Sequence, residues 1–255
     1  MIKNIVKKII PFHLRYYIRQ VILSSSVNEN TLLKKEFYSW FIKEGDTVFD
    51  VGANMGNRVK TFLGFNARVI AVEPQKSCIQ YLRLMFGKKI TLITKGLGAR
   101  EGIKKFYISD SSTISTFSEE YIQAVKKSGR FSKNKWDKTE EIEITTLDNL
   151  IQLYGVPAFI KIDVEGFEKE VLSGLTQKIN SLSFEYCIPE QLNQVIDCIN
   201  LLTISNPKMK FNFSIGETMK FELQTWLNAD EMLALVKSEK FLSTGFGDVY
   251  GKNFE

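Results

Sequence analysis

The sequence contains few of the side chains on which metal centres and hydrolytic triads depend. Its only histidine is His13, which disfavours a histidine-based metal site and a Ser-His-Asp triad. Three cysteines show no C-x-x-C spacing and leave an odd count, which indicates reduced thiols and disfavours a zinc site. Because reduced thiols are typical of the cytosol, we expect a cytoplasmic protein. The three cysteines are Cys78, Cys187 and Cys198.

Long apolar runs are also lacking, and so is any excess of basic residues in the body of the chain. No stretch approaches the roughly 20 apolar residues that are needed to span a bilayer. Five of the 34 Lys and Arg residues precede the first acidic residue, Glu29, and the other 29 balance the 29 acidic residues. Nucleic acid binding across a basic face is therefore not indicated. The five residues are Lys3, Lys7, Lys8, Arg15 and Arg19.

Residues 1–23 form a basic amphipathic segment, with apolar residues at helix-like intervals and lysines between them. Two interpretations stay open: the segment lies in a membrane interface, or it packs as a helix on the domain or on a second subunit of a homo-oligomer. Pro11 and the charges break any apolar signal-peptide core, so a secretory signal is not indicated.

Length and composition predict an N-terminal segment at 1–44 and one main domain at 45–255.

A ten-residue stretch at 47–56, T-V-F-D-V-G-A-N-M-G, has the pattern of a buried strand followed by a glycine turn. Gly52 and Gly56 permit a close approach of the backbone to a ligand, and one of them can adopt a positive φ. A strand, a glycine turn and a helix together begin a nucleotide-binding α/β unit. Glu73 lies 21 residues beyond Gly52, after the apolar run 69–72, and this spacing suits a carboxylate that binds ribose hydroxyls.

The chain then alternates strands and helices, which predicts a parallel sheet with right-handed crossovers. Beyond an expected strand at 104–108 the alternation breaks, and residues 110–140 are rich in Ser, Lys and aromatic side chains. This insertion is too long for a plain connection, so it is either a lid or substrate loop or a disordered surface loop. Its aromatic residues either stack on a sugar ring or form a small core of their own. They are Phe117, Tyr121, Phe131 and Trp136.

A second informative stretch, F-I-K-I-D-V-E-G-F-E at 159–168, delivers two acids to the carboxyl end of an apolar strand. Open α/β sheets place their chemistry at that edge, so Asp163 and Glu165 are candidate catalytic residues. Glu185 lies close to the end of the next expected strand, 182–186, and is the third candidate. A closing strand at 248–250 brings the count to about seven core strands.

Six motifs carry a resemblance to a known family. The chain reads D-V-G-A-N-M-G at 50–56, V-E-P at 72–74, T-L-D-N-L at 146–150, I-K-I-D-V-E-G-F-E at 160–168, S-F-E-Y at 183–186 and G-D-V-Y at 247–250. From about Thr47 to the C-terminus it resembles the FkbM-type methyltransferases. The resemblance implies an α/β, Rossmann-like class I methyltransferase with a seven-stranded, mostly parallel sheet, helices on both faces and an antiparallel last strand. It also implies S-adenosylmethionine as the methyl donor.

The expected cofactor site combines the glycine turn with the strand ends around it. Asp50 orients the turn or reaches the cofactor's amino group through water, and Glu73 accepts hydrogen bonds from the ribose hydroxyls. Residues 95–97 are expected beside the adenine. The next helix begins with Asn57-Arg58 instead of a Ser/Thr-rich turn, which leaves the polar contacts of the methionine moiety open. The full set is Asp50, Gly52, Asn54, Gly56, Glu73, Pro74, Gly96, Leu97 and Asp163.

Family members commonly methylate hydroxyl groups, so the resemblance implies O-methylation of a sugar, a glycan or a small natural product. A hydroxyl must lose its proton as it attacks, and with His13 outside the matching region the base is expected to be a carboxylate. Asp163, Glu165 and Glu185 are the candidates, and we favour direct base catalysis. Alternatively, Asp163 and Glu185 hold a Mg²⁺ ion that acidifies the hydroxyl.

Two further residues and two alternative functions complete the predictions. Glu168 is expected only to favour the N-terminus of the next helix, and Lys161 is expected to pair with one of the acids. The alternatives are a methyltransferase directed at nitrogen or at a protein side chain, and a cofactor-binding protein without catalysis. The basic segment at 1–23 would suit an acceptor that is carried on a lipid or a polysaccharide.

Overall fold

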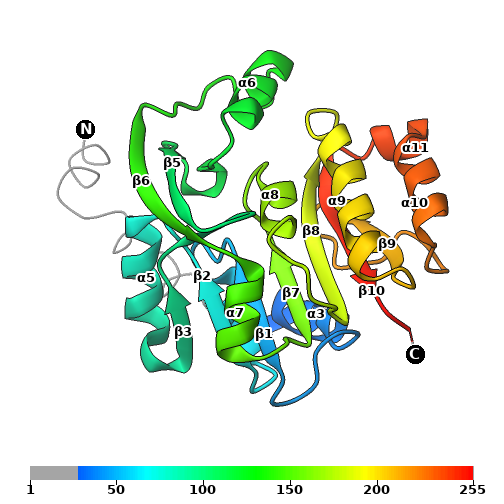
Figure 1. Ribbon diagram of the computed structural model, residues 1–255, viewed down its shortest axis with the longest axis horizontal. Helices are drawn as coiled ribbons and strands as arrows, with labels where there is room; N and C mark the ends of the chain where they lie inside the picture. Colours follow the sequence, from blue (N-terminus) through cyan, green and yellow to red (C-terminus); the bar gives the residue numbers. More distant parts are fainter. Residues whose placement is uncertain (1–27, 255) are drawn as a thin grey trace.

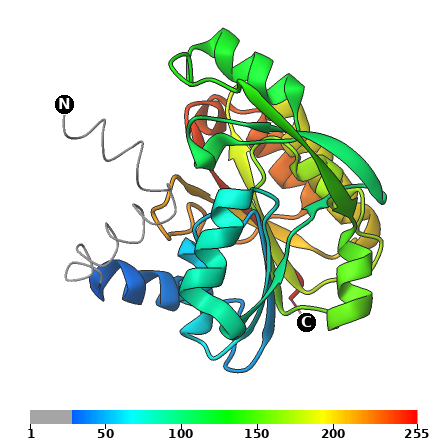
Figure 2. The same ribbon diagram turned by 90° about the vertical axis from the view of Figure 1, so that its left-hand side faces the viewer.

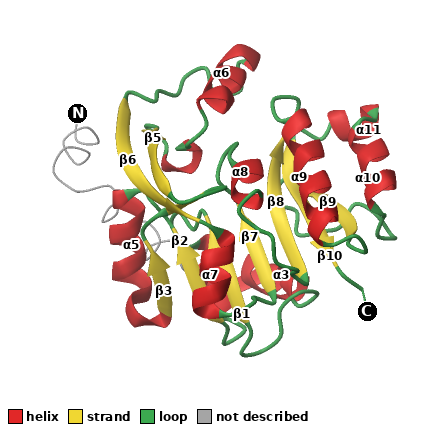
Figure 3. Ribbon diagram, viewed as in Figure 1, coloured by secondary structure: helices red, strands yellow, loops and turns green. Residues whose placement is uncertain are grey.

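The structure is a computed structural model, and it describes the backbone of residues 28–254. The basic amphipathic segment predicted at residues 1–23 lies outside the described residues. Within 28–254, every helix is too short or too polar to cross a bilayer. The described chain forms a large sheet with helices on both faces and a smaller sheet beyond its carboxyl edge (Figures 1 and 3).

Seven strands form the large sheet. They are β1 (Thr47–Val51), β2 (Arg68–Val72), β3 (Ile90–Ile93), β7 (Phe159–Ile162), β8 (Ser181–Cys187), β9 (Lys210–Ile215) and β10 (Phe246–Lys252). Their order is β3-β2-β1-β7-β8-β10-β9; the first five are parallel, and β10 runs antiparallel to both of its neighbours. This topology confirms the predicted Rossmann-like fold of a class I methyltransferase, including the antiparallel last strand.

Helices enclose one hydrophobic core on each face of this sheet. They are α3 (Asn28–Tyr38), α4 (Asn57–Leu63), α5 (Lys76–Phe86), α7 (Leu147–Tyr154), α8 (Glu168–Leu172), α9 (Leu192–Ser205), α10 (Ala229–Val236) and α11 (Glu239–Leu242). One core packs Phe49 and Ile160 against residues of α7 to α11. The other packs Val48 and Phe159 against residues of α3 to α5. Both cores exist because the central strands are apolar on both sides, as buried parallel strands are.

Aromatic side chains attach the end of α3 to the sheet. Tyr38 and Phe41 contact Phe159 of β7, with ring centroids 5.7 and 4.8 Å apart, and Phe41 stacks on Tyr250 of β10 at 5.6 Å. Aromatic pairs at such separations add to the stability gained by burial. Residues before position 44 thus contribute to the main core, and the predicted division of the chain at that position stays a prediction.

A second sheet flanks the insertion. It consists of β4 (Gly96–Leu97), β5 (Gly102–Ile108) and β6 (Lys138–Thr145) in the order β4-β6-β5. Between β5 and β6 the chain forms α6 (Glu119–Ser128), which lies beyond the carboxyl edge of the large sheet (Figures 1 and 2). The interpretation as a disordered loop is therefore wrong, whereas a role as a lid stays a prediction.

Most aromatic residues of the insertion form a small core. Tyr121, Phe131 and Trp136 pack with Val125 and with Cys187 of β8. Of the two interpretations of these aromatics, a core of their own is confirmed for the three. Phe117 differs from them, because it packs against the main core and also lines the cavity that is described below.

The glycine turn after β1 is fixed by its contact with the end of β7. The N–H of Asp163 donates to the carbonyl of Val51 at 2.9 Å, which brings the two strands together where the turn begins. Gly52 has a φ of +83°, and a Cβ atom there would lie 1.8 Å from the carbonyl oxygen of Asp163. Gly56 has a φ of +74°, and its Cβ atom would lie 2.4 Å from the ring of Phe86. The absence of a side chain at these two glycines therefore leaves space for Asp163 and Phe86. The sequence did not indicate this reason for the glycines.

Gly52→Ala is predicted to lower the free energy of unfolding by about 3 kcal/mol or more, because left-handed strain and an overpacked contact coincide. Gly45 provides the matched control, since its φ is +81° and no atom lies within 4 Å of its Cβ position. Gly45→Ala should lose only about 1–2 kcal/mol. Chemical denaturation measures both losses. Equal losses would show that the contact with Asp163 does not matter.

Candidate active site

A cavity of about 280 Å³ lies at the carboxyl edge of the large sheet. Its walls come from the turns after β1, β2 and β7, from the end of β8, from β4 and from the insertion. The cavity therefore brings together both informative stretches of the sequence. The predicted site residues that line it are Asp50, Gly52, Asn54, Glu73, Pro74, Gly96, Leu97, Asp163, Glu165 and Glu185, and the one that does not is Gly56.

Glu73 follows β2 and is held by backbone donors. Its side chain is only 4% exposed; Oε2 accepts from the N–H of Asn54 and Oε1 from the N–H of Gln75, both at 2.7 Å. Burial raises the pKa of Glu73 to about 7, against the effect of these hydrogen bonds. Because a carboxylate oxygen has two lone pairs, each oxygen can accept a second hydrogen bond from a hydroxyl in the cavity.

One wall of the cavity is apolar. Leu97 of β4 lies there with Phe106 and Phe117, whose ring centroids are 4.7 Å apart. Gly96 permits this packing, since a Cβ atom at that position would lie 2.5 Å from the ring of Phe117. A flat, weakly polar group such as adenine suits a wall of this kind.

Asp50 is the penultimate residue of β1, next to the glycine turn. It is 2% exposed, and its carboxylate accepts a hydrogen bond from the N–H of Val59. Its Oδ2 atom has no hydrogen-bond partner among the residues that the structure describes. Burial raises the pKa of Asp50 to about 7, although the charges of Lys161 and Arg58 oppose this. A buried polar atom without a partner in a cavity is suited to a donor group of a ligand.

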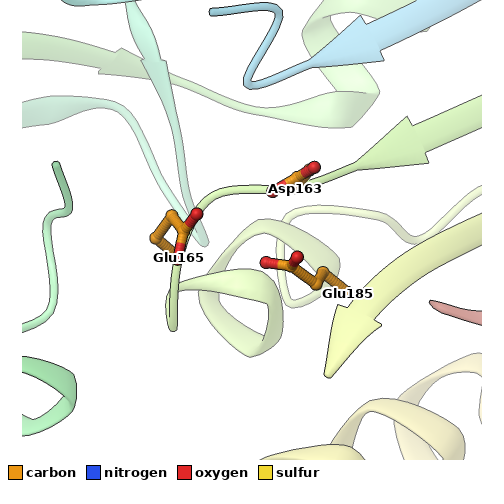
Figure 4. Close-up of side chains that lie close together, drawn as sticks. All are labelled: Asp163, Glu165 and Glu185. Atoms are coloured by element: carbon orange, nitrogen blue, oxygen red, sulfur yellow. The ribbon is translucent and has the colours of Figure 1, made fainter. Parts of the chain in front are cut away.

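Three carboxylates gather at the strand ends on the other side of β1 (Figure 4). Asp163 follows β7, Glu165 lies in the turn before α8, and Glu185 lies on β8. One carboxylate oxygen from each residue lies within 4.8 Å of the other two. The three side chains lie close together in Figure 4, as expected for residues at or just beyond the ends of adjacent parallel strands.

The insertion reaches this site through hydrogen bonds to Glu165 and Asn54. The hydroxyl of Tyr121 donates to Oε2 of Glu165 at 2.8 Å, and the hydroxyl of Thr116 donates to the carbonyl of Glu165 at 2.6 Å. Asn54 of the glycine turn donates from Nδ2 to the carbonyl of Ser112 at 3.0 Å. These contacts place the insertion against both the cofactor-binding turn and the carboxylate cluster.

Lys161 neutralises part of the cluster's charge from within the sheet. It lies on β7 and is 1% exposed; its Nζ is 2.8 Å from Oδ1 of Asp248 and 3.2 Å from Oδ2 of Asp163. The predicted pairing of Lys161 with one of the acids is confirmed. Burial would raise the pKa of Asp163, but the charges of Lys161 and Arg58 outweigh it and hold this pKa below its ordinary value.

The two glutamates of the cluster have raised pKa values instead. Burial raises the pKa of Glu165 well above its ordinary value, and the charge of Asp163 adds to the shift. Burial likewise raises the pKa of Glu185, and the charges of Asp163 and Glu165 follow as causes. The cluster therefore combines one carboxylate that is held ionised with two that have a high affinity for a proton.

Glu168 has a structural role, as predicted. It lies in the first turn of α8, is buried, and accepts hydrogen bonds from the N–H groups of Val164 and Gly166, each at 3.1 Å. It does not line the cavity. These bonds hold the turn that carries Asp163 and Glu165.

Sequence reasoning missed several residues of the site. Arg58 and Glu217 both line the cavity and form an ion pair with an Nη2–Oε1 distance of 2.9 Å. Asp248 is the second partner of Lys161, and its position in the G-D-V-Y motif was a usable signal. No sequence pattern indicates that Arg58 meets Glu217, because they lie at opposite ends of the domain's sequence.

The residues of this cavity fit S-adenosylmethionine. Glu73 offers acceptors for two ribose hydroxyls, the wall at Leu97 suits the adenine, and Asp50 has an unpaired buried oxygen for a donor. A Rossmann-like sheet with an antiparallel strand inserted next to its edge, and with a cavity of this lining at its carboxyl ends, matches the architecture of class I S-adenosylmethionine-dependent methyltransferases. The sequence matches the Methyltransferase FkbM domain over residues 50–238, so the chain belongs to this family. A comparison with curated protein sequences found no match.

Solved methyltransferase structures resemble the chain at low sequence identity. A TehB-like SAM-dependent methyltransferase from Corynebacterium glutamicum is 9% identical, with a TM-score of 0.47 over 95% of this chain and 98% of that chain. Precorrin-6y C5,15-methyltransferase from Geobacter metallireducens is 8% identical, with a TM-score of 0.45 over 88% of this chain and 86% of that chain. An rRNA methylase from Streptococcus thermophilus is 11% identical, with a TM-score of 0.42 over 88% of this chain and 95% of that chain. Similarities this distant indicate nothing about the acceptor.

Glu73→Ala is predicted to weaken S-adenosylmethionine binding at least about tenfold, because hydrogen bonds to an ionised group contribute roughly 1.5–3 kcal/mol. Titration calorimetry measures the affinity, and thermal unfolding without ligand reports any damage to the turn held by Glu73. Glu120→Ala, an exposed change on α6, is the control. Unchanged affinity in the Glu73 variant would remove the ribose role.

Proposed function

We propose that the protein transfers a methyl group from S-adenosylmethionine to a hydroxyl group of a sugar, a glycan or a small natural product. The observation that carries this proposal is the carboxylate cluster at one end of the cofactor cavity. Glu73 follows β2, and the cluster follows β7 and β8, with β1 between them. A cofactor bound at Glu73 and across β1 would therefore extend towards the acids, where an acceptor could meet its methyl group.

The cofactor supplies a methyl group that is already activated by its sulfonium charge. The protein's own contribution is to bind both partners in line and to take the proton of the hydroxyl. Asp163, kept ionised by Lys161, can accept a hydrogen bond that orients the acceptor hydroxyl. Glu185 is the best candidate for the base, since burial and the charges of Asp163 and Glu165 raise its affinity for a proton. Glu165 is less free to act, because one of its oxygens accepts the Tyr121 hydroxyl.

A carbohydrate acceptor suits this site because it carries several hydroxyl donors and the cluster offers several carboxylate acceptors. Two observations bear on the alternatives. The acidic cluster would also attract an amine, so N-methylation is the second candidate function. A Mg²⁺ ion has three carboxylates within reach, but the ammonium of Lys161 already compensates part of their charge. We therefore favour hydroxyl methylation with a carboxylate base and without a metal.

The proposal is tested by a methyl-transfer screen with isotopically labelled S-adenosylmethionine. Nucleotide sugars, glycan fragments and lipid-linked sugars serve as acceptors, each compared with a matched amino sugar, in Mg²⁺ and in EDTA. We expect a methyl ether on a sugar hydroxyl and the same rate in EDTA. Methylation of nitrogen alone would contradict the proposed acceptor, and loss of turnover in EDTA would contradict direct base catalysis.

Glu185→Gln and Asp163→Asn are each predicted to reduce turnover by about 100-fold or more, because general base catalysis typically contributes 10²–10⁴-fold. Glu185→Gln should leave the affinity for S-adenosylhomocysteine unchanged, which separates loss of chemistry from loss of cofactor binding. Glu120→Gln on the surface of α6 should retain full turnover. Full activity of the Glu185 variant would exclude it as the base.

A further inference from the structure

Arg58 is a buried cation beside the cofactor cavity, and its hydrogen-bonding capacity is only partly used within the described residues. It is the second residue of α4, it is 8% exposed, and it lines the cavity. Its Nη2 pairs with Glu217, whereas its Nε has no hydrogen-bond partner among the described residues. A guanidinium has five donors, and a buried donor without a partner costs free energy.

Among the described residues, the carboxylate that pairs with Arg58 lies at the surface. The side chain of Glu217 is 62% exposed and is shared with Lys34, whose Nζ lies 3.7 Å from Oε2. Because Glu217 is solvated and shared, it does not by itself account for a guanidinium kept out of water. The unused donor at Nε leaves room for a second anionic partner within the cavity.

Asp50 carries the charge opposite to that of Arg58. It lies two residues before Gly52, Arg58 follows the glycine turn, and both residues line the same cavity. Each is buried, and each retains one polar atom without a partner among the described residues: Oδ2 in Asp50 and Nε in Arg58. A carboxylate and a guanidinium on either side of one turn are complementary to a ligand that carries an ammonium and a carboxylate on the same carbon.

We propose that Arg58 binds the α-carboxylate of the methionine moiety of S-adenosylmethionine, while Asp50 accepts a hydrogen bond from its α-ammonium. The assignment follows because the other parts of the cofactor already have partners in the cavity: Glu73 suits the ribose, and the wall at Leu97 suits the adenine. The amino-acid end then extends along β1 towards Asp50. A planar guanidinium binds a carboxylate through two parallel hydrogen bonds, which compensates for the absence of a Ser/Thr-rich turn at the start of α4.

The competing explanation is a structural one, in which Arg58 only connects α4 to the turn after β9 through Glu217. Two comparisons separate the explanations. The first uses two ligands: S-adenosylhomocysteine contains the amino-acid end, whereas 5′-methylthioadenosine retains the adenine, the ribose and the sulfur but lacks that end. The second uses Glu217→Gln, which breaks the internal ion pair and leaves Arg58 in place.

The experiment is titration calorimetry of the full chain with both ligands. Arg58→Met should weaken S-adenosylhomocysteine binding about 10- to 100-fold, the range for charge-assisted hydrogen bonds, and change 5′-methylthioadenosine affinity by less than about twofold. Glu217→Gln should retain or increase the affinity for S-adenosylhomocysteine, because the guanidinium loses a competing partner. Lys60→Met, an exposed change on the same helix, should affect neither ligand.

Two results would overturn the proposal. Equal weakening of both ligands by Arg58→Met, reproduced by Glu217→Gln, would show that Arg58 maintains the shape of the cavity. Unchanged S-adenosylhomocysteine affinity in Arg58→Met would show that the guanidinium does not touch the cofactor. Thermal unfolding of each variant without ligand verifies that it is folded before it is titrated.

Discussion

The ion pairs of the buried Lys161 ammonium are the interactions on which the carboxylate cluster depends. It lies between Asp163 and Asp248, so it joins β7 to the antiparallel β10 and keeps one member of the carboxylate cluster ionised. Removing one partner of a buried ion pair typically costs about 3–5 kcal/mol, so the fold and the charge of the site are linked through this residue. Burial, together with the charge of Asp163, then raises the pKa of the two neighbouring glutamates. One lysine thereby makes three similar side chains chemically different.

Under the proposed function, the cavity has a side for the methyl donor and a side for the acceptor along the sheet edge. The donor side follows β1 and β2, where Glu73 accepts backbone hydrogen bonds and the glycine turn closes against the end of β7. The acceptor side follows β7 and β8, and Tyr121 of the insertion completes it through Glu165. Asp163 contacts the end of β1 and belongs to the cluster, so it links the two sides directly. This coupling suits a reaction in which catalysis consists largely of alignment.

The sequence predicted the parts of this arrangement that depend on local pattern. The strand and glycine turn at 47–56 and the acids at 163 and 165 follow apolar runs whose ends are visible in the sequence. Contacts between distant segments could not be predicted in this way: Arg58 reaches Glu217, and Tyr121 reaches Glu165, through tertiary packing that no local pattern encodes. The contact of Gly52 with the end of β7 could not be predicted either, since a glycine pattern indicates a close approach without identifying what approaches.

The central claim is that buried carboxylates in this cavity bind the methyl donor, and the pH dependence of S-adenosylhomocysteine affinity tests it most directly. Burial raises the pKa values of Glu73 and Asp50 to about 7 in the free protein. Ribose hydroxyls and an ammonium favour the ionised carboxylates, so binding should release protons below that pH. We predict that the affinity increases as the pH rises through about 7 and then levels off. An affinity that stays constant or falls over this range would contradict the account.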